Sequence, residues 1–333
     1  MTGARRFGAV IVNYNCAPLA LDAALSFLGA GGAKAVVVDN ASTDDSVVYL
    51  RRILSGAERH APVAPRDPLA GGEVVFADPA SVPPGALTLM PARKNGGFAY
   101  GSNIGLRALS ALSGIDRLLL LNPDALVSRG ALAAFSRRLD DAAAGLCGAT
   151  VVEFDAPHRV QAFGGASFNR LSLIGRNLGQ GEDPAYAPDR NVIEARLGYP
   201  LGAAIALHKD YLARAGYLDE RYFLYYEEVD WAFAGGSAFR PVWAPDAIVY
   251  HRYGAASKSV RTGPDAPSQR SALSDYHMAR SRRLFAAKWA PALFPSTIAL
   301  GAAQAARRAL RGRHENAAAV LRGAMPGSSR TFA

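Results

Sequence analysis

Short apolar runs alternate with helix-like stretches through the first 154 residues, and this alternation limits the fold more than any other feature of the chain. The runs are apolar at nearly every position, as strands covered on both faces are, and each of the first four precedes a stretch with helical spacing. The pattern predicts an α/β fold in which a mostly parallel sheet has helices on both faces. The predicted strands are “FGAVIVNYN” (7–15), “KAVVVDNAS” (34–42), “LTLMPARKN” (87–95), “DRLLLLNPDA” (116–125) and “GLCGATVVEF” (145–154).

Polar residues stand at the ends of four of these strands. One such cluster would be an ordinary turn or helix cap. In parallel sheets, however, the carboxyl ends of the strands meet at one edge, and ligands bind there. Four clusters at that edge therefore favour a shared polar ligand. The clusters are “NYN” (13–15), “DNASTD” (39–44), “RKNGG” (93–97) and “NPD” (122–124).

Two common ways of holding a phosphate are missing from the sequence. The fingerprint GxGxxG does not follow the first predicted strand, and no GxxxxGK[ST] motif is present. These absences exclude a typical Rossmann dehydrogenase and a P-loop NTPase. A divalent cation on carboxylate oxygens is another way to hold a diphosphate. Asp124, just past an apolar strand, offers such an oxygen, although Asn-Pro-Asp alone is also a good turn sequence.

The middle of the chain is less regular. We expect loops at 158–170 and 179–191, a strand and a helix at 198–216, and a strand that ends in His251. Between them lies “YYEEVDW” (225–231), which places three acids behind two tyrosines without a basic residue in the segment. The aromatic neighbours indicate that the acids are partly walled off from water, where carboxylates usually have a task.

The net charge of +9 comes entirely from the end of the chain. Residues 1–269 hold 26 basic and 26 acidic residues, whereas residues 270–333 hold 11 basic residues against Asp275 and Glu315. A neutral body with a basic, helical tail does not fit a nucleic-acid-binding protein. The apolar part of the tail, about 290–306, is too short and too interrupted by prolines for a membrane span of ~20 residues.

Two roles remain open for this tail. It could lie on an anionic membrane surface through residues 270–325, or it could pack on the neutral body of the protein or on a second subunit. The start of the chain passes from two arginines straight into a strand, without a visible signal peptide. Cys16 and Cys147 form neither a disulfide framework nor a metal-ligand spacing. We therefore predict a cytoplasmic protein, placed at the inner face of the plasma membrane if the tail binds lipid.

The order of motifs resembles that of inverting family 2 glycosyltransferases, and especially their rhamnosyltransferase-like branch, which acts on dTDP-rhamnose and similar nucleotide sugars. The resemblance covers about residues 7–260. It rests on “VIVNYN”, “VVVDNASTDDS”, “NGGFAYGSNIGL”, “LLLLNPDA”, “GAAIALHKD…GYLDERYFLYYEEVDWAF” and “VYHRYGAAS”. It implies a GT-A-type nucleotide-diphospho-sugar transferase fold, with a Rossmann-like sheet.

The resemblance also implies a division of the chain. A catalytic domain would occupy residues 1–265, with a nucleotide-binding half at about 7–154 and an acceptor-side half at about 155–265. The basic helical tail would occupy residues 266–333.

The same resemblance assigns roles to the strand ends. The residues that it places on the nucleotide are Asn13, Tyr14, Asp39, Arg93, Lys94, Asn95, Gly97 and Asn122. In the family, a DxD-like motif binds Mg²⁺ or Mn²⁺, and its metal-binding acid falls on Asp124, with Asn122 in place of the first aspartate. His251 matches a histidine that adds a ligand to the cation or the diphosphate in some relatives.

The acid cluster gains a role from the resemblance. The family's catalytic base is the second acid of an “ED” pair, and this position is Glu228, where aspartate is commoner. On a helix Glu227 and Asp230 share a face and Glu228 points about 100° away. We group Glu227 and Asp230 with Gly202 and Ala203 on the substrate side, and expect these two acids to salt-bridge arginines and place the helix.

The implied activity is an inverting transfer of a sugar, rhamnose from dTDP-rhamnose in the first instance. The donor would be dTDP- or UDP-linked, and the acceptor a glycan or a polyprenyl-linked saccharide. Two alternatives stay open: a non-catalytic nucleotide-sugar-binding protein, and a membrane-docked scaffold of a glycan-assembly complex. A homo-oligomer is also left open.

Overall fold

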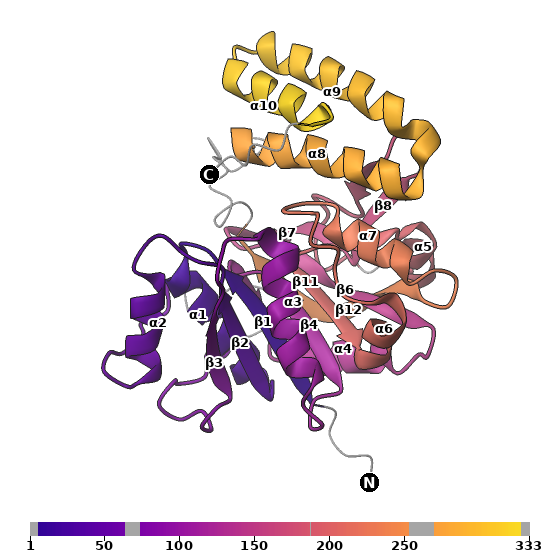
Figure 1. Cartoon of the computed structure of the whole chain (residues 1–333). Coiled ribbons are helices and arrows are strands. Elements are labelled where there is room, and N and C mark those ends of the chain that lie inside the picture. The colour runs from indigo at the N-terminus through magenta and orange to yellow at the C-terminus, as the bar shows by residue number, and fades with distance from the viewer. Residues whose placement is uncertain (1–5, 64–73, 187, 253–269, 328–333) are drawn as a thin grey trace.

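A computed structural model describes residues 6–63, 74–186, 188–252 and 270–327 (Figure 1). Within these ranges a nine-stranded sheet has the order β3-β2-β1-β4-β11-β6-β12-β5, with β7 paired to β6, and a three-stranded sheet has the order β10-β8-β9. The strands are β1 (Phe7–Asn13), β2 (Lys34–Asp39), β3 (Leu87–Pro91), β4 (Arg117–Leu121), β5 (Ala125–Val127), β6 (Ala144–Glu153), β7 (Ala156–Phe163), β8 (Gly165–Asn169), β9 (Ile174–Asn177), β10 (Tyr199–Pro200), β11 (Ala204–His208) and β12 (Arg240–His251).

The helices cover both faces of the large sheet, as the sequence predicts. Alternate residues of β1 face opposite layers: Ala9 and Ile11 pack with α1, α2 and α4, whereas Val10 and Val12 pack with α3, α6 and α7. The helices are α1 (Ala17–Gly29), α2 (Ser46–Leu54), α3 (Gly97–Ser110), α4 (Ala131–Leu139), α5 (Arg190–Arg196), α6 (Lys209–Ala215), α7 (Glu227–Ala234), α8 (Ala272–Trp289), α9 (Phe294–Ala309) and α10 (His314–Ala324), with a 3₁₀ turn at Pro291–Leu293.

The four predicted strands with polar ends are neighbours in the sheet. Strands β3, β2, β1 and β4 run parallel to one another. Asn13 pairs with Asp39, and Asp39 in turn pairs with Pro91, so that the strand ends come level. The polar clusters that follow these strands therefore meet at one edge, which confirms the predicted arrangement.

The other half of the sheet is mixed. Strand β11 lies antiparallel between β4 and β6, and β12 runs parallel to β6. The end of β12 pairs with β5, so that His251 lies opposite Ala125. This pairing brings the last residue of a late strand next to the turn that contains Asp124.

One predicted loop is wrong. The segment 158–170 forms most of β7 and all of β8 instead of a loop. Its strands are partly exposed, and they are interrupted by Gly164 and by Gly165 at the start of β8, both with positive φ. The segment therefore lacks the apolar run that would have marked its strands in the sequence. The described residues of the segment 179–189 form no helix or strand, and residue 187 lies outside the described residues. Helix α5 starts at Arg190.

The tail is helical as predicted, and it packs on the body of the protein. Helices α8, α9 and α10 form a separate layer at the top of Figure 1, in which α8 lies nearest to α7 and β8. Within the described part of the chain, no helix combines the length and the apolar character that crossing a bilayer requires. The predicted domain boundary at 265/266 and residues 253–257 of the “VYHRYGAAS” motif lie outside the described residues.

Candidate active site

The ends of β1 and β2 form a hydrogen-bonded acid–amide pair. The Asn13 side chain is fully buried, and its Nδ2 donates to Asp39 Oδ1 at 2.7 Å. Ser42 supports the same carboxylate, because its Oγ donates to Oδ1 at 2.6 Å and its backbone N–H to Oδ2 at 3.0 Å. Tyr14, the next residue after Asn13, is 39% exposed. The hydrogen bonds thus fix the Asp39 carboxylate, with the accessible Tyr14 ring following Asn13 in the chain.

A second network shapes the turn between β3 and α3. Asn40 Nδ2 donates to Asn95 Oδ1 at 2.9 Å and to the Gly97 carbonyl at 3.0 Å. The backbone N–H of Gly97 donates to Asn95 Oδ1 at 3.1 Å. Asn95 and Gly97 therefore build the turn, while Arg93 and Lys94 are exposed on it. Sequence reasoning missed Asn40 and Ser42, whose positions inside “DNASTD” were the available signal.

This turn borders a cavity shared with the segment that leads to α7. The cavity has a volume of about 380 Å³. The amino group of Lys94 lies 5.5 Å from the centre of the Tyr100 ring at its wall. Its lining residues are Lys94, Gly96, Tyr100, Asp219, Glu220 and Arg221.

Asp124 and His251 meet, as their predicted shared role requires. His251 Nε2 lies 3.2 Å from Asp124 Oδ1, and both side chains are buried. The other ring nitrogen, Nδ1, lies 2.8 Å from Gln161 Oε1. Because an amide oxygen only accepts, the Nδ1–H group of His251 donates to Gln161, and Nε2 faces Asp124. Gln161, on β7, was not predicted because its segment was expected to be a loop.

These donors fit a cation that also binds a phosphate. Among the described residues, no group of three or more His, Cys, Asp or Glu side chains could hold a metal by itself. Mg²⁺ usually takes one or two carboxylates from the protein and completes its shell with water and substrate phosphates. One carboxylate and one imidazole oriented by an outer amide match that pattern. Burial, with smaller effects from the charges of Asp124, Asp44 and Asp39, raises the pKa of the neighbouring Cys16 thiol to about 11.

The acid cluster lies at the start of α7. Tyr225 and Tyr226 have φ of 67° and 70°, and the helix begins at Glu227. Oε2 of Glu227 and Oε2 of Glu228 are buried and accept no hydrogen bond from the described residues. Burial raises the pKa of Glu228 to about 7. Burial and the charge of Glu228 raise the pKa of Glu227 well above its usual range.

Glu228 faces the segment between β10 and β11. A Cβ atom placed on Gly202 would lie 4.0 Å from Glu228 Oε1, so the glycine keeps space open beside this carboxylate. The next residue, Ala203, is buried and accepts a hydrogen bond through its carbonyl from the Asn122 N–H at 3.0 Å. The Gly202–Ala203 backbone thus connects the turn of Asp124 with Glu228.

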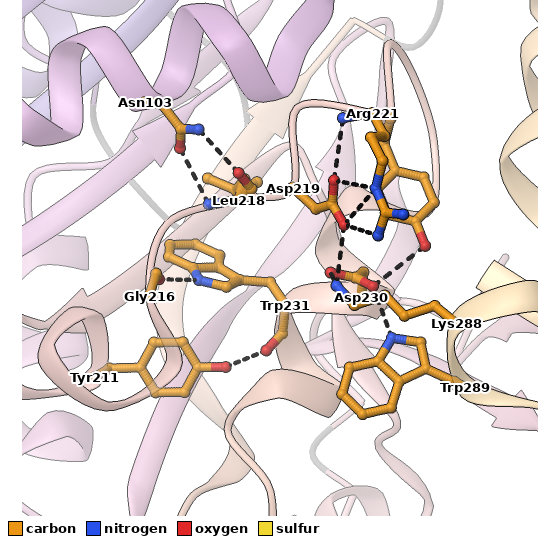
Figure 2. Close-up of polar contacts among 11 residues, drawn as sticks. Asn103, Tyr211, Gly216, Leu218, Asp219, Arg221, Asp230, Trp231, Lys288 and Trp289 are labelled. Carbon is orange, nitrogen blue, oxygen red and sulfur yellow. Dashed lines mark hydrogen bonds and ion pairs between the residues drawn. The ribbon is translucent and has the colours of Figure 1, made fainter. Parts of the chain in front are cut away.

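Asp230 has partners other than those expected. Lys288 Nζ donates to its Oδ2 at 2.8 Å, Trp289 Nε1 to its Oδ1 at 2.7 Å, and Tyr222 OH to the same oxygen at 3.2 Å (Figure 2). The prediction that Asp230 would form a salt bridge with an arginine was wrong. Glu227 makes no ion pair with any described residue. Lys288 and Trp289 were not predicted as partners of Asp230 because they belong to the tail, 58 and 59 positions away in the sequence.

Comparisons with known proteins identify the fold. No protein-family model and no curated protein matches the sequence. The solved structure of GalNAc-T7 with UDP, GalNAc and Mn²⁺ superposes with a TM-score of 0.52 at 11% identity, over 75% of this chain and 44% of that one. The fold is GT-A.

The GT-A fold confirms the predicted fold class. Two structures of S. aureus TarS 1–349, one of them with UDP, are also similar, with a TM-score of 0.43, 12 to 13% identity, and coverage of 84% of this chain and 64% of theirs. The chain therefore spans less than half of the GalNAc-T7 chain and under two thirds of the TarS fragment. On a shared fold, function depends on the residues of the site.

Proposed function

We propose that the protein is an inverting glycosyltransferase that moves a sugar from a nucleotide-diphospho-sugar to a glycan or lipid-linked acceptor. The observation that carries the proposal is the position of Glu228: a partly accessible carboxylate whose pKa is near 7, joined through the Gly202–Ala203 backbone to the Asp124 turn. A base next to Gly202 and a diphosphate site next to Ala203 suit a transfer reaction.

The chemistry is a single displacement. The acceptor hydroxyl gives its proton to Glu228 while its oxygen bonds to the anomeric carbon. The bond from that carbon to the diphosphate oxygen breaks, and the nucleoside diphosphate leaves with the electron pair. A positioned base contributes ~10²–10⁴ in rate and works best when its pKa is near the operating pH. The raised pKa of Glu228 meets this condition.

Asp124 and His251 are the residues that would hold Mg²⁺ or Mn²⁺. The bound cation supplies Lewis-acid stabilisation of the charge on the leaving diphosphate. On the donor side, the buried Asn13–Asp39 pair fixes the ends of β1 and β2, and the exposed Tyr14, Arg93 and Lys94 beside these ends would contact the nucleotide. The finer assignment is rhamnose from dTDP-rhamnose; support for it comes from the order of sequence motifs.

Replacing the base should separate donor binding from transfer. In Glu228→Gln the site keeps its shape but cannot accept the proton, so we expect transfer to fall ~10²–10⁴-fold while donor affinity stays within about twofold. A panel of dTDP-, UDP- and GDP-sugars with Mn²⁺ is first screened by thermal shift and donor hydrolysis. Transfer and calorimetric donor affinity are then measured with the donor that responds.

The exposed Glu182 provides the matched control, Glu182→Gln, which should behave like the wild type. Unchanged transfer in Glu228→Gln would remove the assigned base. Donor binding without hydrolysis or transfer in the wild type would favour a non-catalytic nucleotide-sugar-binding protein instead.

A further inference from the structure

The C-terminal end of α8 contacts α7, the acid helix, which carries Glu227, Glu228 and Asp230. The Lys288 ammonium lies between two carboxylates, 3.0 Å from Asp219 Oδ2 and 2.8 Å from Asp230 Oδ2. The Trp289 indole N–H donates to the other oxygen of Asp230 (Figure 2). Arg221 and Lys288 hold the pKa of Asp219 well below its usual range. The end of α8 is thus bound to α7 and to the loop before it by charged hydrogen bonds, which are the strong kind.

The preceding turns of α8 hold the backbone that leads into α7. Arg280 Nη1 donates to the Arg221 carbonyl at 2.7 Å, and Ser281 Oγ to the Leu224 carbonyl at 2.9 Å. Arg282 Nε donates to the Tyr226 hydroxyl at 3.0 Å. These contacts hold the segment 221–226 at its first, fourth and last residues.

An aromatic cluster joins the same two helices. Phe285 of α8 is 1% exposed, and its ring lies 5.0 Å from that of Phe233, 5.3 Å from that of Phe168 and 5.8 Å from that of Tyr226. Edge-on rings at these separations add to the free energy of apolar burial. Phe233 is on α7, so the apolar contact fixes the helix that carries Glu228.

Helix α7 needs outside support. It has eight residues, and isolated helices of under about 12 residues are marginal in water. Its N-cap, Tyr226, makes no side-chain cap, and two consecutive tyrosines have left-handed backbone, which is unfavourable for residues with a Cβ atom. Two buried glutamates in the first turn add mutual repulsion. Helix α8 supplies outside support through its contacts with Tyr226, Asp230 and Phe233.

We propose that α8 is a positioning element for the transfer reaction, in which Lys288, Trp289 and Arg282 fix α7 so that Glu228 faces the donor. This inference rests on the proposed function. The three are positioning residues, because each acts through Asp230 or Tyr226 rather than on substrate.

Lys288 also balances the charge of Asp230, which stands two positions from Glu228 on α7. The titratable groups packed around this turn are Glu227 and Asp230 on α7 itself, Tyr226 before it, Tyr199 of β10, and Lys288 and Arg270 from the tail side. Removing Lys288 leaves Asp230 without its counter-charge two positions from Glu228. An added negative field favours the protonated form, so the acid limb of the kcat profile should move to higher pH.

The test uses the full chain and compares Lys288→Met with Lys288→Arg, Trp289→Phe and the control Lys209→Met. Lys209 binds the Leu112 carbonyl at the start of α6, outside the candidate site. We expect Lys288→Met to lower kcat between about tenfold and a hundredfold, because small misplacements of a catalytic group have effects of that size. Donor KM should stay within about twofold, and Lys288→Arg should recover most of the rate.

Trp289→Phe keeps an aromatic ring and loses the N–H donor, so it should lower kcat with little loss of stability. Unchanged kcat and pH profile in Lys288→Met and Trp289→Phe, in an enzyme that Glu228→Gln inactivates, would overturn the inference alone. Absence of transfer by the wild type with every donor would overturn the proposed function instead.

Amide hydrogen exchange of residues 219–234 provides a readout that needs no activity. We expect faster exchange there in Lys288→Met and Trp289→Phe than in Lys209→Met, since protection depends on the local contacts that hold the segment. Unchanged exchange would show that α8 does not hold α7 and would overturn the inference even in an inactive protein.

Discussion

At the scale of single residues, two neighbouring acids of α7 have opposite environments. Asp230 receives hydrogen bonds on both oxygens, from Lys288, Trp289 and Tyr222. Glu228 has a buried oxygen without a hydrogen bond from the described residues, and burial raises its pKa to about 7. A carboxylate with all its hydrogen bonds made stabilises the structure. A carboxylate that lacks them and has a pKa near 7 is suited to take up a proton during a reaction.

The pKa of Glu228 sets the expected pH dependence of transfer. The base works only when deprotonated, so kcat should fall tenfold per pH unit below about pH 7 and level off above it. The ordinary carboxyl pKa of glutamate would place that limb at about 4.3 instead. Measuring kcat from pH 5 to 9 with saturating donor checks this expectation. A flat profile down to pH 5 would contradict the burial-raised pKa.

Removing the acid at the strand end should uncouple donor binding from the metal. Asp124→Asn keeps the size of the side chain and loses the charge that would hold a divalent cation. We expect at least about a tenfold loss of donor affinity in Mn²⁺, since ligand and outer-shell changes commonly cost 10–100-fold in metal sites. In EDTA, Asp124→Asn and wild type should bind equally. Titration calorimetry with and without Mn²⁺ measures both, and equal affinities in Mn²⁺ would argue against a metal on Asp124.

At the scale of elements, the parts that the sequence predicts well are those whose residues carry the signal locally. Strands β1, β2 and β4 are buried along almost their whole length and appear as apolar runs, and their shared polar edge follows from parallel packing. Strands β7 and β8 lack such runs. Because the sequence favours a loop at 158–170, it does not predict that Gln161 lies on a strand and orients His251.

The contacts of α7 show a different limit of sequence reasoning. Asp230 and Lys288 are separated by 58 positions, and neither residue type nor spacing indicates that they meet. The aromatic neighbours of the acids correctly predicted a walled-off cluster, but the expected partners of Glu227 and Asp230 were nearby arginines. Only packing of the tail on the body supplies the lysine.

At Gly97, the first residue of α3, the segment that leads to α7 packs closely against the backbone. Its φ is 86°, and a Cβ there would lie 2.2 Å from the Phe223 carbonyl oxygen. Gly31 has a similar φ of 93° but open space around it. Gly31→Ala should therefore show only the backbone cost of ~1–2 kcal/mol. Gly97→Ala should lose clearly more, because the Phe223 backbone must also move.

Urea unfolding of both alanine variants measures the difference. Equal losses of unfolding free energy would mean that the close approach of Phe223 is easily relieved. A larger loss in Gly97→Ala, with weaker transfer, would tie the turn to the acid helix.

At the scale of the whole molecule, the positive charge of the chain is gathered on the side of the tail. Helix α8 faces the body, whereas α9 and α10 form the outer part of the layer (Figure 1). Leu310 is 89% exposed between the exposed residues Arg307 and Arg311. We propose that this outer surface contacts anionic lipid, which would place a polyprenyl-linked acceptor near the site.

Binding to vesicles tests the proposed lipid contact. Vesicles with anionic lipid should bind the wild type, and binding should weaken at high salt because each basic residue near such a surface contributes about 1 kcal/mol of screened attraction. The double variant Arg307→Gln/Arg311→Gln should bind less, and the control Arg137→Gln, on the body, should not change binding. Equal co-sedimentation with neutral and anionic vesicles would contradict the proposal.

The attachment of α8 to α7 has a consequence for shortened chains. Lys288 and Trp289 lie 58 and 59 positions beyond Asp230, whereas every strand that the structure describes ends at or before His251. A chain cut between β12 and α8 would therefore keep the strands and lose the side chains that hold α7.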